Sequence, residues 1–321
     1  MTLATIIRLL KENDDGYVSG EEISRQLNIT RTGIWKHIQE LRRRGYKVEA
    51  SPHLGYRLTA SPDKLFPWEI CNGLNTTNIG TDFFYYDTVS STMDEAFRRG
   101  VEGAPEGIVV CAESQSKGRG RLGRSWSSPK GKGIYLSVLV RPSVSPMEAT
   151  KLTLLSAVAL CEAVRRSTGI EAAIKWPNDL LVKQRKLAGI LTELSAEVDR
   201  VNFVVIGIGL NVNALMGQLP PQATSIKMEA GRSFSRPEIV REILRSLDGW
   251  YVRWLDEGDV PILQRWKELS STLGKNVRVL EGKTPCEGEA VDLAPDGGLL
   301  VKLADGTIVK KMSGDVVQVG R

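Results

Sequence analysis

The sequence contains very little histidine. Of its 321 residues only two are histidine, His37 and His53, and both fall within the first sixty positions. The rest of the chain therefore has no imidazole for Ser-His-Asp or Cys-His nucleophilic catalysis, or for a histidine-ligated metal site. Any chemistry in that larger part must proceed without imidazole.

Cysteine and long apolar runs are also scarce. The four cysteines are scattered and form no Cys-x-x-Cys pair, which argues against a zinc knuckle or a disulfide framework. The longest apolar stretch, at 152–164, is shorter than the ~18 to 20 residues that span a bilayer, and no signal-peptide pattern opens the chain. We therefore expect a cytoplasmic protein that binds no membrane and has no tightly bound metal or prosthetic group.

The composition is that of a folded protein with several domains. Hydrophobic residues make up 41% of the chain and charged residues 25%. At roughly 100 to 200 residues per domain, the length fits two or three domains. The net charge of +5 is only mildly basic, so contacts with nucleic acid or phosphate must come from local clusters.

The first sixty residues have the pattern of three helices followed by a β-wing. Apolar residues recur at helical spacing in the first segment, Ser19 with Glu22 is typical of a capping box, and Thr30 can cap a third helix that ends at Gly45. The expected elements are helices at 3–10, 19–27 and 30–44 and strands at 46–49 and 56–58. This order predicts a winged helix-turn-helix at 1–60.

The third of these helices is basic. Between Arg31 and Lys47 there are six lysines or arginines and one acid, Glu40. In a helix-turn-helix the third helix enters the major groove with its N-terminal residues leading, and later residues lie nearer phosphate. We predict base contacts from Arg31, Thr32, Trp35 and Lys36, and phosphate contacts from Arg42 and Arg43. A protein-docking domain with a solvated basic face is the alternative.

Beyond the head, Ser61, Pro62 and Pro67 predict a linker at 61–68. A catalytic domain is expected at 69–272. From 275 onward, short β runs alternate with Asp-Gly turns, which is the pattern of a small barrel, expected at 273–321.

The most informative segment is the loop Gly118–Arg124, Gly-Arg-Gly-Arg-Leu-Gly-Arg. No acidic residue lies between Ser114 and Met147, and glycines let backbone amides approach a phosphate closely, so this uncompensated basic cluster predicts a bound anion. The spacing also matches Gly-x-Gly-x-x-Gly, but no helix pattern follows and no acidic ribose partner lies about 20 residues on. A dinucleotide fold is therefore excluded, and an RNA-binding Arg-Gly loop remains an alternative. The basic residues of this segment are Lys117, Arg119, Arg121, Arg124, Lys130, Lys132 and Arg141.

Four further short motifs surround this loop in sequence. Ser90-Ser91-Thr92 precedes a helical stretch and can either cap it or hold a polar ligand; the triplet alone favours capping. Lys175-Trp-Pro-Asn-Asp179 is a turn at a strand end, Lys186-Leu-Ala-Gly-Ile190 opens another strand, and Gly207-Ile-Gly-Leu-Asn211 ends a third. Together with the arginine loop they predict a pocket.

The arginine loop with Trp126, followed by the last three of these motifs in this order, resembles the motif set of biotin protein ligases. With the winged head, the chain is similar over essentially its whole length to bifunctional biotin ligases that repress the biotin operon. The resemblance implies an α+β protein with a winged helix-turn-helix, a central mixed-sheet catalytic domain like that of class II synthetases, and an SH3-like C-terminal barrel.

The resemblance also implies a two-step reaction. Biotin and ATP, with Mg²⁺, would give biotinyl-5′-AMP and pyrophosphate, and a lysine of a biotin carboxyl carrier domain, from acetyl-CoA carboxylase or a related carboxylase, would then accept biotin. Such chemistry needs positioned cations more than acid-base residues. The family further implies an adenylate-bound homodimer that binds operator DNA.

Site residues carry over motif by motif as implications of the resemblance. The catalytic set is Lys186, Arg121 and Asp179, with Asp179 also implied for Mg²⁺. The biotin set is Ser91, Thr92, Gln115, Arg119, Gly120, Arg121 and Lys186. The adenylate set is Gly118, Arg119, Arg121, Arg124, Lys175, Asn178 and Asn211. Met93 and Leu122 depart from the family's usual polar and basic residues, so no side-chain role is carried to Met93 and a looser phosphate grip is expected at Leu122.

Two other functions stay open. A lipoate ligase would share the catalytic fold, although such ligases usually lack this head. A transcription factor that only senses biotinyl-adenylate would keep the head, but would not need the loop arginines and Lys186. In the leading interpretation, Gly118–Arg124 is a mobile lid that traps the adenylate.

Overall fold

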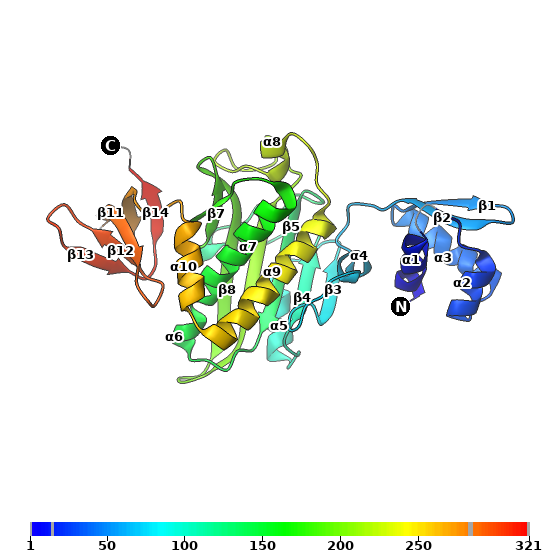
Figure 1. The fold of residues 1–321 in the computed structure, drawn as a ribbon, viewed down its shortest axis with the longest axis horizontal. Coiled ribbons are helices and arrows are strands. Elements are labelled where there is room, and N and C mark those ends of the chain that lie inside the picture. The colour runs from blue at the N-terminus through cyan, green and yellow to red at the C-terminus, as the bar shows by residue number, and fades with distance from the viewer. Residues whose placement is uncertain (1, 14–15, 282–284, 320–321) are drawn as a thin grey trace. The chain divides into compact units, whose positions relative to one another are not determined.

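The computed structural model describes residues 2–13, 16–281 and 285–319. The chain forms two compact units, one ending at Asn72 and the other beginning at Gly73. No helix in the described ranges is long and apolar enough to cross a membrane. Figure 1 gives the order of helices and strands within each unit.

The first unit has the predicted head. Its elements are α1 (Thr2–Glu12), α2 (Gly20–Leu27), α3 (Arg31–Arg43), β1 (Lys47–Ser51) and β2 (Gly55–Ala60). Ser19 Oγ accepts from the Glu22 amide at 3.1 Å, and Thr30 Oγ1 accepts from the Gly33 amide at 3.2 Å. Both predicted N-caps are therefore confirmed. The apolar faces of α2 and α3 are buried, with Ile23, Ile34 and Ile38 in the core of the head.

The segment predicted as a linker, 61–68, and the first residues of the predicted catalytic domain contribute to the packing of this unit. α4 (Pro67–Cys71) places Glu69 in a buried position, where it accepts from Tyr46 Oη at 2.6 Å and from Lys11 Nζ at 2.5 Å. Phe66 stacks on Trp68 with ring centroids 4.8 Å apart. These contacts explain why the first unit extends to Asn72; the division at 60, 68 and 272 stays a prediction.

The second unit is built on a seven-stranded mixed sheet in the order β3-β4-β5-β9-β8-β7-β6. Only β3 and β4 run parallel among the neighbours of this sheet in the described ranges. The strands are β3 (Asp82–Tyr86), β4 (Ile108–Ala112), β5 (Gly133–Val140), β6 (Ala173–Lys175), β7 (Asp179–Val182), β8 (Arg185–Ala196) and β9 (Val201–Asn211). This is the mixed sheet that the family resemblance implies.

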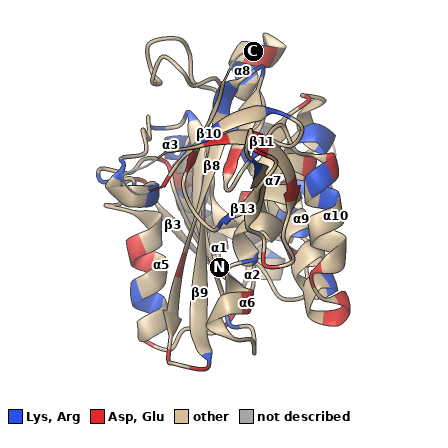
Figure 2. Ribbon diagram, turned by 90° about the vertical axis from the view of Figure 1, so that its left-hand side faces the viewer, with Lys and Arg blue, Asp and Glu red and all other residues tan. Residues whose placement is uncertain are grey.

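Helices cover both faces of the sheet. Figure 2 shows α5 (Thr92–Val101) on one side and α7 (Leu152–Thr168), α9 (Arg236–Glu257) and α10 (Val260–Glu268) on the other. Met93 and Ala96 of α5 pack on Leu139, Phe203 and Val205 of the sheet. A short α6 (Pro146–Ala149), with Ser145 in a capping box, precedes α7.

The C-terminal strands form a separate antiparallel sheet in the order β13-β12-β11-β10-β14. The strands are β10 (Asn276–Leu280), β11 (Cys286–Leu293), β12 (Leu299–Lys302), β13 (Ile308–Lys311) and β14 (Asp315–Gln318). Gly297 and Gly306, the glycines of the two Asp-Gly turns, have positive φ, as such turns require. The short α8 (Ile226–Ala230) was not anticipated from the sequence.

Candidate active site

The arginine loop is a closed hairpin. The Trp126 amide donates to Gly118 O at 2.9 Å, and the Gly120 amide donates to Arg124 O at 2.7 Å. At its tip a single 3₁₀ turn, Arg121–Gly123, places Leu122 at a left-handed φ of 55°. No helix follows the loop, so the exclusion of a dinucleotide fold is confirmed.

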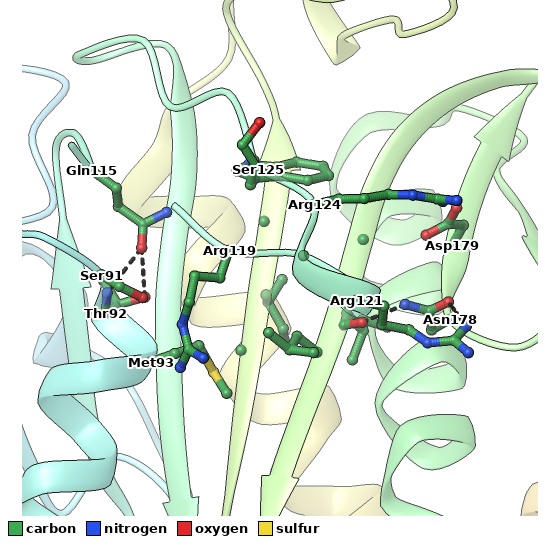
Figure 3. A pocket seen from close by; sticks show the side chains of 18 of the residues that line it. Ser91, Thr92, Met93, Gln115, Arg119, Arg121, Arg124, Ser125, Asn178 and Asp179 are labelled. Carbon is green, nitrogen blue, oxygen red and sulfur yellow. Dashed lines mark hydrogen bonds between the residues drawn. The ribbon is translucent and has the colours of Figure 1, made fainter. Parts of the chain in front are cut away.

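The predicted site residues converge on one cavity over the sheet. Figure 3 shows the Ser91, Thr92 and Gln115 group on one side of it and Arg121, Asn178 and Asp179 on the other. The predicted residues that line it are Ser91, Thr92, Gln115, Arg119, Gly120, Arg121, Arg124, Asn178, Asp179 and Lys186. Lys175 and Asn211 line an adjoining cavity that shares Trp126, Asp179 and Lys186. Gly118 lies at the base of the hairpin instead.

At the start of α5 the capping interpretation of Ser91 is wrong. Ser91 holds the N-cap position, but its side chain makes no capping bond. Gln115 Oε1 takes that role, accepting from the Thr92 amide at 2.9 Å and from Thr92 Oγ1 at 3.2 Å. The Ser91 hydroxyl is buried and finds no hydrogen-bond partner within the described residues. A buried hydroxyl without a partner is costly, and a ligand that formed a hydrogen bond with it would remove that cost.

Two glycines of β9 form the floor of the cavity. A Cβ on Gly209 would come within 2.5 Å of Trp126 Cε2, and a Cβ on Gly207 would overlap the Met93 thioether. Glycine is therefore required here to let an indole and a thioether lie flat on the strand. Trp126 Nε1 is also buried without a partner in the part of the chain that the structure describes.

The sequence suggested that the basic residues of this segment have no acidic partners, but several of them form ion pairs. Arg119 pairs with Asp94 of α5 at 2.7 Å and with Glu193 of β8 at 2.8 Å. Arg124 pairs with Asp315 of β14, and Lys130 pairs with Asp87. The fold brings these carboxylates from distant segments, so the absence of nearby acids in the sequence does not mean unbalanced charge.

Arg121 has a different environment. Its Nη1 donates to Asn178 Oδ1 at 2.9 Å, and Asn178 Nδ2 donates to Ile190 O at 2.6 Å. Burial lowers the pKa of Arg121, and the carboxylates of Asp315 and Asp179 act in the opposite direction. The guanidinium is therefore partly desolvated and oriented by a neutral amide.

Lys186 and Asp179 face each other across the β7–β8 hairpin. Lys186 Nζ lies 2.7 Å from Asp179 Oδ1 and 5.5 Å from the centroid of the Trp126 ring. Asp179 is also the register partner of Lys175 on β6. Burial lowers the pKa of Lys175, while Asp179 raises it. Asp179 thus forms an ion pair with Lys186, and its charge also acts on Lys175 beside the cavity.

The described side chains offer few ligands for Mg²⁺. The described residues contain no group of three or more His, Cys, Asp or Glu that could hold a metal ion. Mg²⁺ commonly uses one or two carboxylates together with substrate phosphates. Asp179 fits such a role for an ion that arrives with a nucleotide.

Several lining residues were not predicted. Asp315 reaches the cavity from the C-terminal sheet, and no local pattern could have identified it. Met93, Leu136, Leu191 and Ile208 supply apolar surface, which alternation along the strands could have indicated but not located. Asn211 donates Nδ2 to Thr224 O at 3.0 Å, so part of its amide supports the loop after β9.

The predicted DNA contacts divide into two groups. Arg31, Thr32, Trp35 and Lys36 are exposed on α3, with Trp35 55% exposed. Arg42, by contrast, donates to Val48 O of β1 at 2.7 Å, and Arg43 pairs with Glu40 at 2.6 Å. The first group is free to meet a ligand, whereas Arg42 ties the helix to the wing.

Three family models match the chain. They are an HTH domain over residues 2–57, the Biotin/lipoate A/B protein ligase family over 85–211, and the Biotin protein ligase C terminal domain over 272–317. The order of the matches is the order of the predicted domains.

Known proteins match over greater lengths. The chain is 38% identical over 319 residues to the bifunctional ligase/repressor BirA of Bacillus subtilis, covering 98% of each chain. It is 34% identical to the biotin--[acetyl-CoA-carboxylase] ligase of Mycobacterium tuberculosis, over 71% of this chain and 85% of that one. A biotin protein ligase from Aquifex aeolicus, solved with biotin and ATP, superposes with a TM-score of 0.65 at 27% identity, covering 74% of this chain and 99% of that chain. The chain therefore belongs to the family of bifunctional biotin protein ligases and repressors.

Proposed function

We propose that this protein joins biotin to a carrier protein through biotinyl-5′-AMP and represses biotin genes when it holds that adenylate. The observation that carries the proposal is the cavity itself. It combines buried, unpartnered polar atoms at Ser91 and Trp126 with the cations of Arg119, Arg121 and Lys186. Such a site suits a ligand with one polar head, an apolar body and an anionic end.

In the first step, a biotin carboxylate oxygen attacks the α-phosphorus of ATP, and pyrophosphate leaves. We assign the Ser91 hydroxyl, with Thr92 and Gln115, to the head of biotin, and the glycine floor with Trp126 to its apolar body. Arg119, Arg121 and Lys186 face the place where two anions must meet. Fixed cations favour this meeting, because their orientation is established before the reaction.

In the second step, the amine of a carrier lysine attacks the acyl carbon of biotinyl-AMP, forming an amide and releasing AMP. Asp179 is suited to orient the incoming lysine, or to hold Mg²⁺ bound to the nucleotide phosphates, where the ion would neutralise phosphate charge. Arg124, Lys175 and Asn211, with the Gly118 backbone, are assigned to the adenylate side. This step requires no imidazole.

The partners follow from the same proposal. The acceptor is a biotin carboxyl carrier domain of acetyl-CoA carboxylase or a related carboxylase, the second ligand is operator DNA, and the protein works in the cytoplasm. An adenylate-bound homodimer would present two heads to a palindromic operator. The exposed Arg31, Thr32, Trp35 and Lys36 support a DNA-binding head.

A direct test combines the purified protein with labelled biotin, MgATP and a biotin carrier domain. We expect label on one carrier lysine and release of pyrophosphate. Footprinting of operator DNA, with and without biotin and ATP, tests repression separately. Absence of transfer would refute the ligase, and protection that ignores both ligands would refute the switch.

Lipoate is the second substrate to test, because the matched family model covers both biotin and lipoate ligases. Parallel reactions with lipoate and a lipoyl carrier domain should give no product. Equal transfer of lipoate would overturn the choice of biotin. Adenylate formation without any transfer would instead favour a protein that only senses the adenylate.

A further inference from the structure

The two ends of the segment that carries the arginine loop lie together. Glu113 follows β4, Gly133 begins β5, and the Gly131 amide donates to Glu113 O at 3.0 Å. The residues between them include Arg119 and Arg121. The direction in which the hairpin leaves the sheet therefore depends on how this base is fixed.

A buried arginine from a distant helix contacts both ends of the base. Arg236, the first residue of α9, is 1% exposed, and its Nη2 lies 2.8 Å from Glu113 Oε2. Its Nη1 donates to Gly133 O at 3.1 Å. One guanidinium thus bridges the end of β4 and the start of β5.

The anchor that carries this arginine is itself well fixed. α9 is 22 residues long and packs beside α7. Just before it, Asn213 Nδ2 donates to Phe234 O at 2.8 Å and Asn213 Oδ1 accepts from the Phe234 amide at 3.0 Å. The position of the guanidinium is therefore set by the helix layer and by the segment that follows β9.

Stability alone gives little reason for such a pair. Burying two charges costs much of what their attraction returns, and apolar replacements of buried pairs are often as stable. An arginine, however, offers a planar fork that fixes two acceptors in one geometry. The Glu113–Arg236 pair is better suited to setting a direction than to adding stability.

We propose that Glu113 and Arg236 are positioning residues for ligation, which hold the base of the arginine loop so that Arg119 and Arg121 point into the cavity. They act through the loop, and neither of them is among the residues that line the two cavities. This inference rests on the proposed function for its kinetic consequence. The consequence for loop order does not depend on any activity.

The test compares Arg236→Lys and Glu113→Gln with Arg141→Lys. Arg141 belongs to the basic segment of the sequence but lines neither cavity, so it is a matched control. It lies beyond the opposite end of β5, and its guanidinium donates to backbone oxygens of Gly100, Ala104 and Asn202. Without ligands, trypsin should cut after the loop arginines faster in both base variants than in the control. We expect kcat/KM for ligation to fall about 10- to 100-fold and KM for ATP to rise, because small misplacements of reacting groups cause rate losses of this size.

A buried charge left alone can prevent folding, so the double variant Glu113→Gln with Arg236→Gln is included, and thermal unfolding is followed for each protein. If the folded double variant keeps the parent's tryptic pattern and kcat/KM, the proposal is overturned. If the parent itself transfers no biotin, the proposed function fails. Faster cleavage in the base variants would still support the positioning of the loop.

Discussion

The basic residues of the first turns of α3 and those of the cavity differ in what surrounds them. In the described part of the chain, Arg31 and Lys36 of α3 make no ion pair, and both are exposed. Arg119, in contrast, is held between Asp94 and Glu193, and Lys186 faces Asp179. A surface that meets a polyanion gains from free cations that release counterions. A small cavity gains from cations whose directions are already fixed.

The largest expected effect is on the cavity side of this comparison. Lys186→Ala should lower the rate of biotinyl-adenylate formation about 10²- to 10³-fold, because it removes a positioned cation from the developing charge. Pyrophosphate release measures this step. Lys183→Ala is the control, since Lys183 is 78% exposed and lines neither cavity. A parental rate in Lys186→Ala would contradict the catalytic role.

Two glycine substitutions test the floor of the cavity. Gly209→Ala places a Cβ within 2.5 Å of Trp126, so we expect weaker biotin binding and a loss of about 1 to 3 kcal/mol in unfolding free energy from overpacking. Gly249→Ala, in open space within α9, should instead stabilise by about 0.5 to 1 kcal/mol. Calorimetric titration and denaturant unfolding measure both effects. A Gly209→Ala variant that is as stable as the parent and binds biotin equally well would argue against the packed floor.

On the head, Arg31 and Arg42 allow an exposed arginine to be compared with one that is hydrogen-bonded to the wing. Arg31→Ala should weaken operator binding by about tenfold or more if it reads a base, and leave ligation unchanged. Arg42→Ala removes the bonds to Val48 O, so it should loosen the wing and leave the salt dependence of binding near that of the parent. Gel-shift titrations at several salt concentrations measure these effects. A lower salt slope in Arg42→Ala would place Arg42 on phosphate.

The smallest effect concerns pH. Burial disfavours the charged form of Lys175 and lowers its pKa, so this lysine should lose its proton at a lower pH than an ordinary lysine does. The rate of ligation should then decline on the alkaline side at a lower pH than it would with an ordinary lysine. Lys175→Arg should move this decline to higher pH. Between the folded and unfolded pKa values the unfolded chain binds more protons, so stability rises with pH there. If the rate of ligation declines at the same alkaline pH in parent and variant, Lys175 does not bind the adenylate.

Much of the head could be predicted because its signals are local. Ser19 and Thr30 cap amides three residues away, and the apolar stripes recur within single helices. Motif order also predicted which segments of the second unit form the site. Leu122 at the loop tip, with its left-handed φ, and the short α4 gave no comparable sequence signal.

The sequence by itself determined the caps of α2 and α3, the wing and the basic loop, because each depends on residues within a few positions of one another. Only the tertiary structure decided that Gln115 caps α5 and leaves Ser91 available. It also decided that Asp94 and Glu193 pair with Arg119 and that Asp315 pairs with Arg124. Ion pairs and cavity walls depend on which distant segments the sheet brings together, and that information is not contained in any one stretch of the chain.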